Sequence, residues 1–270
     1  MKKAKHDWKK SKVIYYSDPL RDDFNEVGLS RPPLAKDYVY ERNNKVANFF
    51  TGLFYFGLVK PILAIFCFFH GIKIKGRKNL KELKGKGFFI YANHVAISDS
   101  FKIQALLFPF KRTDAVGYTD AMSVPLLGGV MKGLGLIPLP LKGDNENMKK
   151  FINSFSYYLA KKEAIIIFPE AHIWPYYTKI RHFRNGSFYY PALNNAPVVP
   201  MVTVWRKSKI SKRSKQTLLI GKPIYPLAGN SVLENKDYLH KATYEAMVNL
   251  SNSVKQYEYI TYIYKEKEAN

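Results

Sequence analysis

Cysteine is almost absent from this sequence. The 270 residues include one cysteine, Cys67, which excludes an internal disulfide and a metal site built from a cysteine cluster. A single thiol is typical of a reducing compartment. No apolar run directly follows the lysines at the N-terminus, so we expect no cleaved signal peptide. Most of the chain is also too polar for a channel that crosses a membrane many times.

Acidic residues are few compared with basic ones. The chain has 21 Asp and Glu against 43 Lys and Arg, which gives a net charge of +22. That excess predicts an anionic partner: nucleic acid, anionic lipid headgroups or a phosphorylated substrate. Aromatic residues make up 15% of the chain, which suits a membrane interface and equally suits stacking on bases. Composition therefore leaves the partner open, although it excludes a disordered or collagen-like chain.

One apolar segment, residues 46–72, is long enough to engage a bilayer, but Lys60-Pro61 interrupts it. Each half has about ten residues and is too short to span alone. Three interpretations stay open: one kinked spanning helix, two short helices dipping into one leaflet with Lys60 reaching the headgroups, or a buried core hairpin. Apolar side chains cover all sides of both halves, which favours membrane contact in a monotopic arrangement. We therefore expect a location at the cytoplasmic face of the cell membrane.

The rest of the chain alternates short apolar runs with helical stretches, which predicts an α/β fold. We expect a mixed, largely parallel sheet flanked by helices and preceded by an N-terminal membrane-associated helical hairpin. Residues 1–45 would form a basic arm, 46–72 the membrane segment, and 73–270 a domain that ends in a C-terminal helix. The expected strands are Ile72–Lys75, Phe88–Ala92, Asp114–Gly117, Leu136–Leu139, Ala164–Phe168, Val198–Trp205 and Thr217–Ile220, and the expected helices are 99–108, 121–133, 146–162, 186–195 and 231–256.

A histidine and an aspartate follow the buried run Phe88–Ala92, with four residues between them. His94 would lie at the carboxyl end of a strand, where α/β proteins usually place their sites. Asp99 would lie in the first turn of the next helix, close enough to orient the imidazole and to stabilise its cation. No nucleophile elbow accompanies the pair, so it fits a general base acting on a substrate hydroxyl. A structural interpretation is open too, because Asp99 is also a good helix cap.

Other charged residues follow the next buried run. Glu170 ends the run AIIIFPE and could bind a hydroxyl or orient the base. Lys179, Arg181 and Arg184 come soon after it, and arginine is a natural clamp for a phosphate. A capping glutamate and a solvated basic loop would explain the same residues.

In these blocks the sequence resembles the glycerolipid acyltransferase family, whose type member acylates 1-acyl-glycerol-3-phosphate. Four blocks stand in the family's order over roughly residues 72–225. They are the His-X4-Asp block from Asn93 to Asp99, Gly135-Leu136-Ile137-Pro138-Leu139, Phe168-Pro169-Glu170 and Val198-Val199-Pro200-Met201. Phe183-Arg184-Asn185-Gly186-Ser187 also resembles a family segment.

Two arginines that the family uses for phosphate binding are missing. Leu141 stands at the first of these places, and Lys142 follows it. At the second, Ala171-His172-Ile173 replaces Gly-Thr-Arg. The resemblance therefore supports the catalytic pair better than the acceptor. Lys142, Lys179 or Arg181 could supply the lost charge.

The resemblance implies a membrane-associated O-acyltransferase that takes part in phospholipid biosynthesis. His94 would be the base and Asp99 its orienting partner; Glu170, Arg181, Arg184, Lys142 and Lys179 would bind substrate. The expected partners are an acyl donor (acyl-CoA or acyl carrier protein), a lysophospholipid acceptor and an anionic membrane surface, with no cofactor, metal or nucleic acid. The alternatives are a different lipid acceptor, a phosphoester hydrolase, or a basic nucleic-acid- or lipid-binding protein without catalysis.

Overall fold

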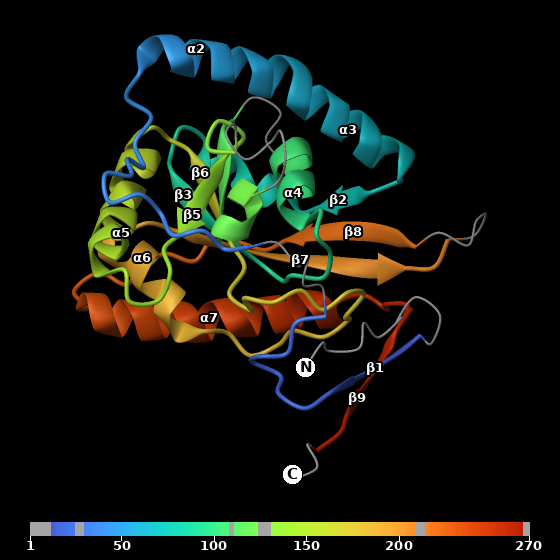
Figure 1. The fold of residues 1–270 in the computed structure, drawn as a ribbon. Helices are drawn as coiled ribbons and strands as arrows, with labels where there is room; N and C mark the ends of the chain where they lie inside the picture. The colour runs from blue at the N-terminus through green and yellow to red at the C-terminus, as the bar shows by residue number, and fades with distance from the viewer. Residues whose placement is uncertain (1–11, 25–29, 108–110, 124–130, 209–213, 267–270) are drawn as a thin grey trace.

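The computed structural model describes residues 12–24, 30–107, 111–123, 131–208 and 214–266 (Figure 1). Within them, seven strands form the main sheet, in the order β2-β8-β7-β3-β6-β4-β5. The pair β7–β8 is antiparallel and the other neighbours are parallel. The strands are β2 (Lys73–Lys75), β3 (Phe88–Ala92), β4 (Thr113–Tyr118), β5 (Leu136–Leu139), β6 (Ala164–Ile167), β7 (Val198–Arg206) and β8 (Lys215–Ile220). The predicted mixed, largely parallel α/β fold is confirmed.

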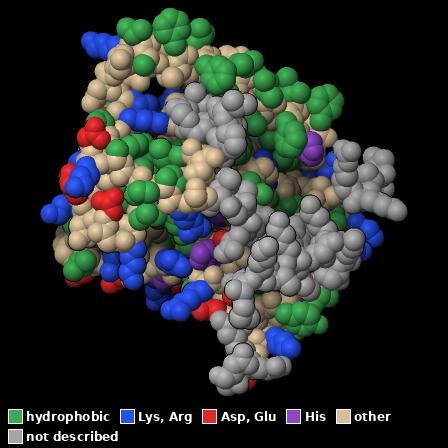
Figure 2. All heavy atoms as spheres, viewed as in Figure 1, with side chains coloured by type: hydrophobic (Ala, Val, Ile, Leu, Met, Phe, Trp, Pro, Cys, Tyr) green, Lys and Arg blue, Asp and Glu red, His purple; other side chains and the backbone are tan. Residues whose placement is uncertain are grey.

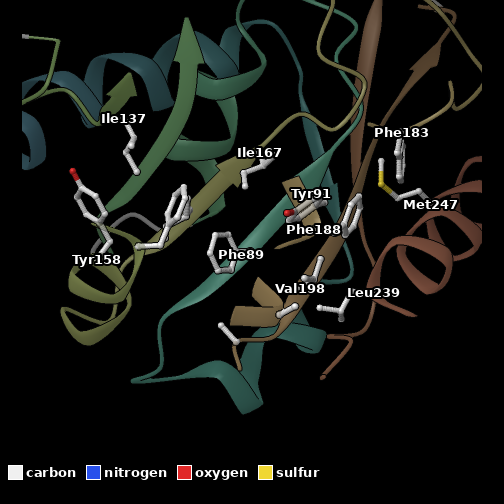
Figure 3. Close-up of a cluster of buried hydrophobic side chains, with 14 of the residues drawn as sticks. Phe89, Tyr91, Ile137, Tyr158, Ile167, Phe183, Phe188, Val198, Leu239 and Met247 are labelled. Atoms are coloured by element: carbon white, nitrogen blue, oxygen red, sulfur yellow. The ribbon is translucent and has the colours of Figure 1, made fainter. Parts of the chain in front are cut away.

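Helices cover both faces of this sheet, and alternate residues of β3 point to opposite faces. Phe89 and Tyr91 pack in the larger core cluster, together with side chains of α5 (Asn145–Ala160), α6 (Tyr189–Leu193) and α7 (Val232–Asn252) (Figure 3). Phe88, Ile90 and Ala92 pack on the other face, against α4 (Asp99–Leu107) and the short helix η2 (Arg77–Leu83). Strand β3 is therefore buried on both faces, which explains its unbroken apolar sequence. The helix predicted over 121–133 falls largely outside the described residues.

The apolar segment is one continuous helix, and the predicted hairpin is wrong. It comprises α2 (Lys45–Phe54), the π-helical turn η1 (Tyr55–Val59) and α3 (Lys60–Phe69). Pro61 lacks an N–H and would clash with a carbonyl of the preceding α-helical turn. The wider turn accommodates it: the N–H of Lys60 bonds to the carbonyl of Tyr55, five residues back. A proline can therefore follow the lysine without ending the helix.

The hairpin interpretation expected Lys60 to reach the lipid headgroups. In the structure its side chain points into the protein instead. The ammonium donates to the carbonyl of Lys111 at 2.6 Å and lies over the rings of Tyr55 and Phe56. The helix is long and apolar enough to cross a membrane, and 17% of its most apolar window is buried in the protein. Its apolar outer face consists of exposed side chains along the whole length (Figure 2): Val46, Phe49, Phe50, Leu53, Phe54, Leu58, Ile62, Ile65, Phe66, Phe68 and Phe69.

The two ends of the chain meet. Strand β1 (Val13–Tyr16) pairs in parallel with β9 (Thr261–Tyr264) as a separate two-stranded sheet. The rings of Tyr16 and Tyr262 pack on Trp174. The basic arm is therefore folded onto the domain through its described residues.

A buried cluster of charges fastens the end of the arm to the sheet. Arg42 donates to Asp114 at 2.8 Å, at the start of β4, and to Glu163, directly before β6. Arg112 adds a second cation at 3.4 Å from Asp114. Because Arg42 lies three residues before α2, this cluster also fixes where the apolar helix begins.

We expect Arg42→Met to lower the free energy of unfolding by about 3–5 kcal/mol, since it leaves two buried carboxylates with one cation fewer. Arg21→Met is the matched control: Arg21 pairs with Asp18, but its side chain is 85% exposed, so its loss should cost less than about 1 kcal/mol. Urea denaturation of both variants measures the difference. Equal stability of the two variants would contradict a buried anchor.

Candidate active site

His94 follows β3, the strand between β6 and β7. The side chain of Asn93, the residue before it, joins the end of β3 to β7 by donating one hydrogen bond and accepting another. Its amide nitrogen donates to the carbonyl of Thr203 at 3.1 Å, and its amide oxygen accepts from the N–H of Thr203 at 2.8 Å. These two bonds hold the chain where it leaves the sheet, so His94 starts from a fixed position.

The turn from His94 to Asp99 closes on one carboxylate oxygen. Oδ2 of Asp99 accepts from the N–H groups of Val95 at 2.8 Å and Ala96 at 2.7 Å. The same oxygen lies 3.3 Å from Nδ1 of His94. This contact fixes Nδ1 as the protonated nitrogen and leaves Nε2 as an acceptor. The structure therefore brings together the two residues that the spacing predicted, in the orientation that a general base requires.

Asp99 is fully buried and ionised. Burial alone would raise its pKa, but the charge of Lys102, and then the hydrogen bond and charge of His94, lower the pKa to about 2. The ammonium of Lys102 lies 2.8 Å from the second oxygen, Oδ1. The carboxylate thus stays negative throughout the neutral range, as stabilisation of an imidazolium requires.

The ring of His94 stacks on Phe168, with centroids 4.0 Å apart and planes 14° apart. Its side chain is 16% exposed. The apolar ring on one side and the Asp99 contact on the other leave a small part of the imidazole open. A partly buried histidine held in one orientation is suited to repeated proton transfer at a single atom.

Glu170 stands behind the backbone of the same turn. Oε2 accepts from the N–H of His94 at 3.2 Å and from the guanidinium of Arg181 at 3.1 Å, and Oε1 accepts from the N–H of Arg181 at 3.0 Å. The side chains of Glu170 and Arg181 are 1% and 2% exposed, and the guanidinium lies over the ring of Trp174. In this arrangement both residues support the turn and the 170–181 segment, and neither side chain faces solvent.

The other three predicted cations are exposed. Arg184 lies beside the motif, because its N–H donates to the carbonyl of Pro169 at 2.9 Å; its guanidinium contacts Nε2 of His172 at 3.2 Å. Lys179 lies on the surface of the segment that follows Glu170. Lys142 follows β5, three strands from β3 and so about 14 Å away across the sheet. Arg184 therefore lies next to Pro169 and Glu170, and Lys142 lies at the sheet edge.

Two residues of this site were not predicted from the sequence. Asn93 was read only as part of a motif, and its bonds to Thr203 span 110 positions, so no local pattern indicates them. Lys102 follows Asp99 by three residues, a spacing that pairs charges on one helix face and could have indicated the contact. Among the described residues, no group of three His, Cys, Asp or Glu side chains could hold a metal ion.

Comparisons with known proteins give a family and a similar fold. Residues 71–204 match the family model described as Acyltransferase. The fold is similar to the crystal structure of the 1-acyl-sn-glycerophosphate (LPA) acyltransferase PlsC from Thermotoga maritima, with a TM-score of 0.52 and 18% identity over 80% of this chain and 86% of that one. At that identity the likeness shows a shared fold. No curated protein sequence matches the chain.

The buried ion pair of Glu170 and Arg181 predicts that replacing Arg181 costs more stability than replacing the exposed Arg184. We expect Arg181→Met to destabilise the protein by about 3–5 kcal/mol, because it leaves the carboxylate of Glu170 buried without its cation. Arg184→Met removes an exposed guanidinium and should cost less than about 1 kcal/mol. Chemical denaturation gives both values, and a larger loss for Arg184→Met would show that the burial assigned to the pair is wrong.

Proposed function

We propose that this protein transfers a fatty acyl group to a free hydroxyl of a lysophospholipid. The proposal starts from the match of residues 71–204 to the Acyltransferase family. The donor is a thioester, acyl-CoA or acyl carrier protein, and the reaction serves phospholipid biosynthesis. The observation that carries the proposal is the contact of His94 Nδ1 with the buried carboxylate of Asp99 at 3.3 Å, at the end of the central strand.

In the proposed reaction Nε2 of His94 accepts the proton of the acceptor hydroxyl. The oxygen attacks the thioester carbonyl carbon, a C–O bond forms and the C–S bond breaks. The thiolate leaves and takes the proton back from the imidazolium, which Asp99 stabilises in the meantime. No covalent enzyme intermediate is needed, because the thioester is already activated. General base catalysis of about 10²–10⁴-fold, together with positioning, supplies the rate.

The acceptor in this proposal is 1-acyl-glycerol-3-phosphate, the compound after which the similar Thermotoga maritima acyltransferase is named. Its phosphate needs a cation near the pair. Arg184 fits this role best among the predicted residues, since its backbone contacts Pro169 next to Glu170 and its side chain is exposed. Lys179 and Lys142 would then contact the anionic surface around the site. A different lysolipid is the alternative, and activity assays on several lysolipids separate the two.

The proposed location is the membrane surface, with the helix Lys45–Phe69 lying flat. Three side chains along this helix hold it in place. Tyr55 and Lys60 donate to the domain carbonyls of Thr113 and Lys111, and Asn48 donates to the carbonyl of Arg42, whose guanidinium is anchored in the domain. A helix bound along its length cannot cross a bilayer without losing these bonds. Its apolar outer face would instead enter one leaflet, on the cytoplasmic side where anionic lipids complement the net charge of +22.

We expect His94→Ala to lower the rate of acyl transfer by about 10²–10⁴-fold, because it removes the proposed base. The release of CoA, followed with a thiol reagent in the presence of acyl-CoA and lysophosphatidic acid, measures the rate. His182→Ala, an exposed histidine outside the pair, should leave the rate unchanged. Turnover within about threefold of wild type in His94→Ala would reject the mechanism. Wild-type activity on other lysolipids, with none on lysophosphatidic acid, would reject the acceptor.

The apolar outer face predicts membrane binding that substitution can remove. We expect the triple variant Phe50→Ser, Leu58→Ser and Phe69→Ser to bind phospholipid vesicles at least about a hundredfold more weakly, because each large apolar side chain contributes about 1.5–3 kcal/mol when buried. Cosedimentation with vesicles of neutral and anionic lipid measures the change.

A matched triple variant changes exposed leucines elsewhere, at Leu193, Leu227 and Leu233, also to serine. It should bind vesicles as the wild type does. Equal binding by both triple variants would show that the helix is not the membrane contact.

A further inference from the structure

A lysine is buried beside the catalytic pair. Lys102, in the first turns of α4, is 3% exposed. Its ammonium lies 2.8 Å from Oδ1 of Asp99 and donates to the amide oxygen of Gln216, in β8, at 2.7 Å. Burial of an ammonium is costly unless it is paired and hydrogen-bonded. Both conditions hold here, so this charge is built into the site.

The two oxygens of Asp99 face different partners. Oδ2 accepts from the turn and from His94, while Oδ1 faces Lys102. With both oxygens engaged, the carboxylate cannot rotate away from the imidazole. The negative charge is also shared between two cations whenever His94 is protonated, and the two cations repel each other.

The side chain of Lys102 also borders an apolar pocket. Its side chain lines a cavity of about 190 Å³ between α3 and α4, together with Leu63, Phe66, Cys67, Ser98 and Phe101. Ser98 supplies the hydroxyl in a lining that is otherwise apolar or thiol, and a water needs two to four polar partners to settle. The polar partners of the ammonium are therefore Asp99 and Gln216.

We propose that Lys102 is a positioning residue for the acyl transfer: it fixes the second oxygen of Asp99 and sets the basicity of His94 through that carboxylate. The inference rests on the proposed function, in which His94 is the base. Without the lysine charge, the full charge of Asp99 would act on the imidazole, and His94 would hold its proton to higher pH. A base that stays protonated at neutral pH is inactive there and recovers at alkaline pH.

The groups around Asp99 determine whether loss of Lys102 raises or lowers the pKa of His94. Within the part of the chain that the structure describes, the sheet contributes neutral Gln216, and α3 contributes the thiol of Cys67, whose pKa burial raises. Glu170 reaches the backbone N–H of His94 and is paired with Arg181. The hydrogen bond and charge of His94, together with the backbone N–H groups of the turn, still favour the ionised form of Asp99 when the lysine is absent. Loss of Lys102 should therefore act mainly on His94.

The test follows the pKa of His94 by NMR of histidine-labelled, substrate-free protein, with the signal assigned from its absence in His94→Ala. We expect Lys102→Met to raise this pKa by about one or more. The acid limb of the pH–rate profile should move by the same amount. At a pH below both pKa values the rate should fall about tenfold, and it should approach the wild-type rate near pH 9, with the KM values changed by less than about twofold.

Three further variants keep the test decisive. Lys102→Gln retains a donor without the charge and should raise the pKa of His94 as well, which covers the case that Lys102→Met fails to fold. Lys102→Arg keeps the charge and should restore both the pKa and the profile. Lys150→Met removes an exposed lysine that pairs with Glu146 on α5 and should change neither.

An unchanged His94 pKa in folded Lys102→Met or Lys102→Gln overturns the proposal, as does a loss of rate that is equal at every pH. Failure of the proposed function gives a different result. In that case the wild type transfers no acyl group to any lysolipid, while the NMR titration still reports whether Lys102 sets the basicity of His94.

Discussion

The site depends on one buried carboxylate whose two oxygens face protein donors instead of water. Asp99 accepts two backbone N–H groups of the turn, contacts the imidazole of His94, and faces the ammonium of Lys102. The backbone bonds make the turn, and the turn places the histidine. The same charge that shapes the backbone therefore also orients the base, so the local fold and the proposed chemistry cannot be separated by changing Asp99 alone. This coupling favours a test through the side chain of Lys102, whose ammonium contacts the carboxylate and Gln216.

Much of the fold could be predicted from the sequence, because each buried parallel strand corresponds to a short run of apolar residues. Strands β3 and β5 begin and end where those runs do, and the other strands of the main sheet differ from the prediction by one or two residues at an end. The pair His94 and Asp99 could be predicted as well, since four intervening residues allow one tight turn. The contact between them joins residues five positions apart, and a pattern over so few residues can be recognised in a single sequence.

Contacts between distant segments could not be predicted in this way. The bonds of Asn93 to Thr203, of Lys102 to Gln216 and of β1 to β9 link residues about a hundred or more positions apart. The prediction of a hairpin was wrong for a related reason, because the outcome depended on contacts with distant residues. Lys60 and Pro61 looked like a break because a charge and a missing N–H disrupt an isolated helix. The domain supplies the carbonyl of Lys111 for the charge, and a π-helical turn accommodates the proline.

The apolar helix packs beside α4, the helix that begins at Asp99. Phe66 and Cys67 of α3 line one cavity with Ser98, Phe101 and Lys102, which flank Asp99 in sequence. A helix that entered one leaflet would thus bring the first turn of α4 to the membrane surface, where the lysophospholipid acceptor of the proposed reaction resides. It would also keep the ammonium of Lys102 in apolar surroundings, where a single charge has its largest effect on neighbouring groups. Docking of the helix along its length and the electrostatics of the pair are therefore two consequences of the same packing between α3 and α4.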